Sequence, residues 1–115
     1  MNAKQRALRN RTREQRTVRR AVKAIATNTP QTARTHLVAA GIDDQTAKRY
    51  AGAFSRGTTP TATTDTVVKL KGRNRKQVTV KLYDAATFTT RLAVYRPRDL
   101  AAAARFEQAA HRLAA

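Results

Sequence analysis

The sequence predicts a mainly α-helical chain that carries one β-hairpin. Two periodicities in its 115 residues indicate this: apolar residues recur at three- and four-residue steps over several segments, and they alternate with polar residues between positions 66 and 83. Lys and Arg number 24 against 7 Asp and Glu, so the net charge is +17. A chain of this charge repels itself when isolated, and the composition therefore favours a polyanionic partner.

Residues 1–27 are predicted to form a basic arm and an amphipathic helix. An apolar stripe of Val18, Val22 and Ile25 is expected to dock a helix of about residues 14–27. Residues 2–13 should continue this helix only when phosphates neutralise their charge, because like charges four residues apart oppose helix formation. A solvated tail without fixed structure is the alternative. Six cations recur at three- and four-residue steps and share one helical stripe: Arg6, Arg9, Arg13, Arg16, Arg20 and Lys23.

The next segment predicts two short helices joined by a tight turn. Thr29 and Pro30 suit the start of the first helix, because a hydroxyl can cap it and proline fits the first helical position. Gly41 suits its end, and Asp43 or Asp44 suits the N-cap of the second helix. The second helix is expected to bury four residues at helical spacing: Ala47, Tyr50, Ala51 and Phe54.

Residues 33–52 resemble the core of helix-turn-helix DNA-binding proteins. The matching positions are the turn glycine, the apolar residue after it and two apolar positions of the second helix: Gly41, Ile42, Ala47 and Tyr50. His36 departs from the pattern, because it stands where the family has an apolar residue. The resemblance covers 20 of the 115 residues.

The resemblance implies that the second helix, residues 44–56, reads bases in the major groove of DNA. Gln suits adenine and Arg suits guanine, while Thr and Lys can contact phosphates. Gly52 would let the helix approach the groove closely. For Lys48 and Arg49, a merely solvated surface is the alternative. The candidate contact residues on the outer face are Gln45, Thr46, Lys48, Arg49 and Arg56.

A β-hairpin with a basic tip is predicted after a polar linker of residues 57–64. Residues 66–71 and 77–83 alternate between apolar and polar, and the connection between them carries Arg73, Arg75 and Lys76. A helix-turn-helix followed by a hairpin resembles a winged helix, which implies that this basic wing contacts an adjacent groove or the phosphates. Protection of a strand edge is the alternative for Lys69 and Lys81, but it does not account for three charges in one turn.

Two further helices are expected at the C-terminal end. Asp84 should cap the first, which Pro97 stops, and Asp99 should cap the second, which runs through Leu113. The chain is thus divided into the arm (1–27), a helix-turn-helix with wing and following helix (28–96), and an Ala-rich helix (97–115). The last helix could complete the core or pair two subunits. The inner faces are expected to hold Ala85, Phe88, Leu92 and Tyr95 in the first helix, and Leu100, Ala103, Phe106, Ala110 and Leu113 in the second.

The sequence favours a binding protein over an enzyme, with no metal and no cofactor. It contains no cysteine, its two histidines (His36 and His111) fall on different predicted helices, and its four glycines form no phosphate-binding loop. No apolar run is long enough to span a membrane, and the N-terminus lacks the apolar region of a secretory signal. The expected location is therefore the cytoplasm, on the nucleoid or in a host cell if a phage encodes the protein.

Three functions fit these observations. The first is a sequence-recognising protein for double-stranded DNA, a small transcriptional or mobile-element regulator of the phage type, with a homodimer as one arrangement on two half-sites. The second is an RNA-binding, ribosome-associated protein whose basic arm folds on RNA. The third is a nucleoid or virion protein that coats DNA without reading its sequence. The sequence favours duplex DNA over RNA as the partner.

Overall fold

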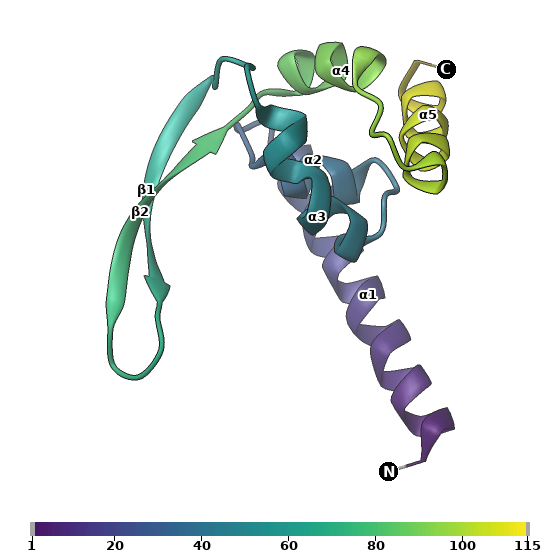
Figure 1. The fold of residues 1–115 in the computed structure, drawn as a ribbon, viewed down its shortest axis with the longest axis vertical. Coiled ribbons are helices and arrows are strands. Elements are labelled where there is room, and N and C mark those ends of the chain that lie inside the picture. Colours follow the sequence, from purple (N-terminus) through teal and green to yellow (C-terminus); the bar gives the residue numbers. More distant parts are fainter. Residues whose placement is uncertain (1, 115) are drawn as a thin grey trace.

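The protein is described here by a computed structural model of residues 2–114, which is mainly helical with one two-stranded antiparallel hairpin (Figure 1). Its radius of gyration is 15.5 Å, against about 13 Å for a compact domain of this length, because one helix and the hairpin extend from the body. No helix within residues 2–114 is both long and apolar enough to cross a membrane. The elements are α1 (Ala3–Ala26), α2 (Ala33–Ala39), α3 (Asp44–Ser55), β1 (Ala62–Lys69), β2 (Arg75–Leu82), α4 (Ala85–Val94) and α5 (Leu100–Ala114).

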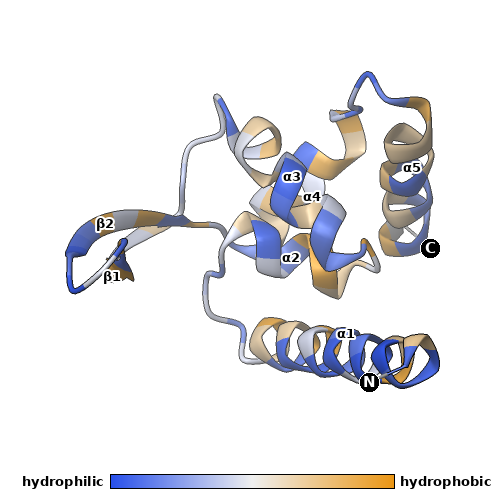
Figure 2. Cartoon of the chain, turned by 60° about the horizontal axis from the view of Figure 1, so that its bottom comes forward, coloured by the Kyte–Doolittle hydropathy of each residue, from blue (hydrophilic) through white to orange (hydrophobic). Residues whose placement is uncertain are grey.

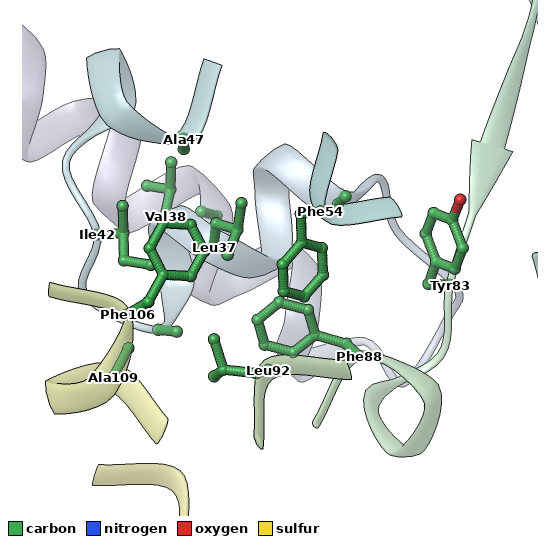
Figure 3. Packing of buried hydrophobic residues seen from close by; sticks show 13 residues of the cluster. Leu37, Val38, Ile42, Ala47, Phe54, Tyr83, Phe88, Leu92, Phe106 and Ala109 are labelled. Carbon is green, nitrogen blue, oxygen red and sulfur yellow. The ribbon is translucent and has the colours of Figure 1, made fainter. Parts of the chain in front are cut away.

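One apolar core joins α2, α3, α4 and α5 (Figure 3). Leu37 of α2 and Phe106 of α5 are fully buried, and the ring of Phe54 in α3 lies 5.4 Å from that of Phe88 in α4. The last helix thus completes the core, which is one of its two predicted roles. Such aromatic pairs add stability beyond the area they bury.

The buried face of α5 is displaced by one residue from the predicted one. Phe106 is buried as expected and the predicted Ala103 and Ala110 are half-buried. The other buried residues are Ala102 and Ala109, whereas Leu100 is 86% exposed. Alanine side chains contribute little apolar area, and neighbouring alanines differ little in what they bury. The sequence therefore could not show which of the alanines of α5 face the core. In α4, Phe88 and Leu92 are buried as predicted, but Ala85 is exposed; Leu113 of α5 is also exposed.

α1 is longer than predicted and docks by another face. It runs from Ala3 to Ala26, so residues 3–13 belong to the helix; the Asn2 side chain caps it. Ala21 is its buried residue, with Thr17 and Ala24 beside it along α2. Of the three predicted docking residues, Ile25 is half-buried, whereas Val18 and Val22 are 41% and 49% exposed. The small side chains let α1 lie close to α2, and the valines lie outside this contact.

α2 begins at Ala33 with Thr32 as its N-cap, not at the predicted Thr29–Pro30 pair. The preceding residue, Gln31, is extended because it forms an antiparallel bridge with Tyr83, through N–H···O bonds of 3.0 and 2.7 Å. This bridge connects the segment before α2 with the end of the hairpin. A pairing over more than fifty residues leaves no local trace in the sequence.

The turn between α2 and α3 follows the prediction. Gly41 has a φ of 103°, a backbone conformation that favours glycine, and it ends α2. Asp43, rather than Asp44, is the N-cap of α3 and accepts a hydrogen bond from the backbone N–H of Thr46. Asp44 instead binds Arg34 at the start of α2. We refer to α2, this turn and α3 as the helical pair.

The hairpin strands begin earlier than predicted. Residues 62–64, predicted to be linker, pair with residues 80–82, and the register runs from Ala62 opposite Leu82 to Lys69 opposite Arg75. The β-branched Thr63 and Thr64 fit an extended strand, which the turn-like composition of the linker obscured. Every residue of β1 is exposed, and the hairpin extends away from the helices (Figure 1).

The base of the hairpin is attached to α2 through His36. Its Nε2 lies 2.6 Å from the carbonyl oxygen of Tyr83, and because a carbonyl only accepts, this nitrogen carries the proton. The His36 ring is buried and stacks on Phe88, with the ring centres 4.7 Å apart. The residue that departs from the helix-turn-helix pattern therefore links the helical pair to the hairpin.

Protonation of His36 is expected to destabilise the fold. Burial, the largest influence, lowers the pKa of His36 below 6.5, although its hydrogen bond to Tyr83 and the charge of Asp84 act in the opposite direction. The unfolded chain therefore binds this proton more readily, and the stability present above about pH 6.5 is lost as the pH falls below it. Urea denaturation at about pH 7.5 and about pH 5.5 should show a lower free energy of unfolding at the lower pH.

The variant His36→Phe should show a smaller decrease between these two pH values, because it removes the titrating group and keeps an aromatic ring. His111→Gln is the control and should keep the full decrease, since His111 is exposed at the surface of α5. If the free energy of unfolding of His36→Phe fell with pH as much as that of the unchanged protein, His36 would not be the group responsible.

Candidate nucleic-acid interface

Polar side chains hold the start of α3 in place. The Asp43 carboxylate accepts hydrogen bonds from the backbone N–H and the hydroxyl of Thr46, at 3.1 and 2.9 Å. Arg105 of α5 donates to this carboxylate and to the Thr46 hydroxyl, at 2.8 Å each. Burial alone would raise the pKa of Asp43, but the Thr46 hydrogen bonds and the Arg105 charge lower it. The carboxylate therefore stays ionised at neutral pH.

The prediction that Thr46 lies on the outer face of α3 is wrong. Only 9% of this residue is exposed, and its hydroxyl is engaged by Asp43 and Arg105. The sequence places Thr46 next to the outward-facing Gln45, and nothing local indicates that a side chain of α5 would cover it. Thr46 thus joins α3 to α5.

The other four predicted residues are all exposed: Gln45, Lys48, Arg49 and Arg56. The first three lie on α3, where their helical spacing puts them on one face. The predicted helix of residues 44–56 ends one residue earlier, at Ser55, so Arg56 is its C-cap residue with an extended backbone. The Arg49 guanidinium carbon lies 5.4 Å from the centre of the Tyr50 ring, within the range of a cation–π contact. From position 45 to position 56 there is no acidic residue. We call these four residues, together with Gly52, the α3 face.

A groove of about 720 Å³ runs beside the α3 face and separates it from the start of α5. Gln45, Lys48 and Arg49 line it from α3, and Asp99 and Arg105 line it from the α5 side. Both of the latter are engaged inside the protein, since Asp99 caps α5 through the N–H of Ala102 and Arg105 binds Asp43. The free cations of this groove therefore belong to α3.

The six predicted arm cations all lie on α1 and are all exposed: Arg6, Arg9, Arg13, Arg16, Arg20 and Lys23. Because α1 is one uninterrupted helix, they form a continuous stripe along about 26 Å at a rise of about 1.5 Å per residue. Arg20 also lines a groove of about 440 Å³ between α1 and α2. The stripe thus reaches the helical pair at its C-terminal end.

Of the predicted hairpin cations, only Arg73 lies in the loop; Arg75 and Lys76 are the first residues of β2. Neighbouring residues of a strand point to opposite faces, so the side chains of Arg75 and Lys76 leave the hairpin on opposite sides. Lys69 lies directly opposite Arg75 in the register. Like charges in this position destabilise a hairpin, and a bound anion would relieve their repulsion.

Arg34 is a basic residue near these elements that the sequence analysis missed. It lines the groove beside α1 together with Arg20, and a second groove of about 300 Å³ together with Gly52 and Lys81. Its guanidinium donates to both oxygens of Asp44, at 2.8 and 2.7 Å. This hydrogen bonding raises the pKa of Arg34 and lowers that of Asp44. Arg34 and Asp44 are ten residues apart and lie on different helices, so the three- and four-residue spacing of a single helix could not have indicated their ion pair.

The three groups of cations are arranged around the helical body. α1 and the hairpin extend toward the same end of the molecule, with α3 between them in this view (Figure 1). Hydrophilic residues occupy most of α1, the visible side of α3 and the tip of the hairpin (Figure 2).

The two histidines lie apart from these cations. His36 is in the core, and the Nε2 atom of His111 lies 4.0 Å from the Glu107 carboxylate on the exposed side of α5. Within residues 2–114, no three His, Asp or Glu side chains are close enough to hold a metal ion together.

The chain matches no protein family, no curated protein and no solved structure. The resemblance to helix-turn-helix proteins therefore depends on the residues of the helical pair themselves.

Replacement of Asp43 by alanine should destabilise the protein by about 1–2 kcal/mol, because it removes the N-cap of α3 and the acceptor of Arg105. The control is Asp44→Ala, which breaks an ion pair with Arg34 that is partly exposed on both sides and should cost less than about 1 kcal/mol. Urea denaturation at neutral pH measures both changes. If Asp44→Ala lowered the free energy of unfolding as much as Asp43→Ala or more, the contacts of Asp43 with Thr46 and Arg105 would not be what holds α3 in place.

Proposed function

We propose that this protein binds double-stranded DNA and recognises its sequence through the α3 face, as a small transcriptional or mobile-element regulator. The observation that carries the proposal is the α3 face itself. Gln45, Lys48 and Arg49 lie exposed together on a helix that contains no acid beyond Asp44, and the exposed Arg56 directly follows its end. Glutamine and arginine have the hydrogen-bonding groups that distinguish adenine and guanine in the major groove.

The arm and the hairpin would hold the phosphates. α1 has 24 residues and is therefore about 36 Å long, close to the length of one turn of B-DNA. Its cations supply a large part of the net charge of +17. Contacts of this kind position a protein on DNA without reading the sequence, so specificity would come from α3.

Fluorescence anisotropy with a random-sequence DNA duplex and a structured RNA of equal charge tests the choice of partner. Across a salt series around 0.15 M, we expect the duplex to bind more tightly than the RNA and to keep measurable affinity as the salt rises. Tighter binding to RNA would contradict the proposal and favour a ribosome-associated role. Equal binding that disappears with salt would favour a DNA-coating protein.

Selection of a preferred site from random duplexes should follow, and a site of two related halves would support a homodimer. On that site, Arg49→Ala should reduce the preference over random DNA by about tenfold, because a bidentate contact to guanine is worth about 1–3 kcal/mol of discrimination. Arg16→Ala in α1 is the control and should weaken binding to all sequences alike. A uniform loss in Arg49→Ala would contradict base reading by α3.

The triple variant Arg73→Ala, Arg75→Ala, Lys76→Ala should bind DNA with a weaker salt dependence. Each lost phosphate contact reduces the magnitude of the slope of log K against log salt by about 0.9. Because Arg75 and Lys76 point to opposite faces of β2, we expect at most two of the three cations to contact phosphates, and therefore a reduction of about 1.8. Arg98→Ala, which lies between α4 and α5 and outside all three groups, should leave the slope unchanged. An unchanged slope in the triple variant would remove the hairpin from the interface.

A further inference from the structure

We propose that Gly52 marks the point of closest approach between α3 and the DNA duplex, where the absence of a side chain lets the DNA reach the helix backbone. This inference rests on the proposed function and names the contact at its centre. It follows from the lack of any reason within the fold for a glycine at this position.

The backbone conformation does not require a glycine there. The three other glycines of the chain have positive φ angles, a conformation that disfavours side chains: Gly41, Gly57 and Gly72. Gly52 has no such angle and lies within the regular helix Asp44–Ser55.

Packing does not require a glycine either. A Cβ atom added to Gly52 would meet no atom within 4 Å, apart from its own neighbourhood in the helix. Glycine inside a helix is less stable than alanine by about 0.5–1 kcal/mol. The protein therefore carries a helix-destabilising residue in α3, and no packing contact of the fold requires it.

The location of Gly52 indicates what approaches it. It lies in the middle of the α3 face, with Lys48 and Arg49 before it and Arg56 after it. It also lines the groove between α3 and β2, together with Arg34 and Lys81. A surface that contacts Lys48 and Arg56 at the same time must pass over Gly52, and a side chain at this position would hold that surface away.

The charge around Gly52 favours an anionic surface. Three cations belong to the α3 face, and the groove beside Gly52 is lined by Arg34 and Lys81 and by none of the acidic residues that the structure describes. The one acid of α3, Asp44, is bound to Arg34. A DNA duplex has both the charge and the smooth groove surface that could contact this position.

A series of side chains at position 52 tests the proposal, with stability and DNA affinity measured on the same proteins. Gly52→Ala should raise the urea midpoint of unfolding, because alanine favours the helix, and yet weaken binding to the duplex by about threefold. Gly52→Leu should weaken it by more than about tenfold. A purely structural role for this position would move stability and affinity in the same direction.

The matched controls lie at Ala104, an exposed residue on the side of α5 away from the core. Ala104→Gly should lower stability, and both Ala104→Gly and Ala104→Leu should leave the affinity for DNA unchanged. These variants show whether a change in helix stability or an added apolar side chain alters DNA affinity anywhere on the surface, or only at position 52.

Two further outcomes would overturn the proposal in different ways. If Gly52→Ala and Gly52→Leu bind the duplex as tightly as the unchanged protein does, the DNA does not approach α3 at Gly52, and the proposed function stands without it. If the unchanged protein prefers structured RNA or binds no duplex, the proposed function fails, and this inference fails with it.

Discussion

The orientation of α3 depends on the burial of one aromatic side chain, Phe54. Its ring lies 5.4 Å from the rings of Phe88 and Tyr95 and 6.1 Å from that of Phe106, so α3, α4 and α5 meet around it. Arg91 of α4 donates to the Phe54 carbonyl at 2.7 Å, which provides a partner for an oxygen in the last turn of α3. Because Phe54 points into the core, the opposite side of α3 faces outward with its glutamine and its cations.

Beyond this small core, polar contacts determine where the basic elements lie. Arg105 joins the start of α3 to α5, and His36 joins α2 to Tyr83 at the base of the hairpin. The outer part of α1 and the hairpin have no core of their own, and both bring like charges close together. That repulsion opposes the compact arrangement, and phosphates would relieve it, so the fold and the proposed partner are coupled through charge.

The candidate interface could be predicted from the sequence to the extent that local spacing determines it. Six of six arm cations, four of five α3 residues and one loop cation occupy exposed positions of the predicted elements. Thr46 could not be predicted, since only the approach of Arg105 buries it, and Arg34 could not, since its contacts lie across the turn and in two grooves. Whether these residues bind DNA remains a prediction from their chemistry.

The sequence by itself determined the helix ends that depend on short-range hydrogen bonds and backbone preferences. Asp43, Asp84 and Asp99 cap their helices as expected, and Gly41 ends α2, because the interacting groups lie within three residues of each other. Tertiary structure alone decided which face of α1 and of α5 is buried and where α2 and the strands begin. These outcomes depend on packing among alanines that are nearly equivalent in apolar area, and on the pairing of Gln31 with Tyr83 far along the chain, neither of which has a local signal.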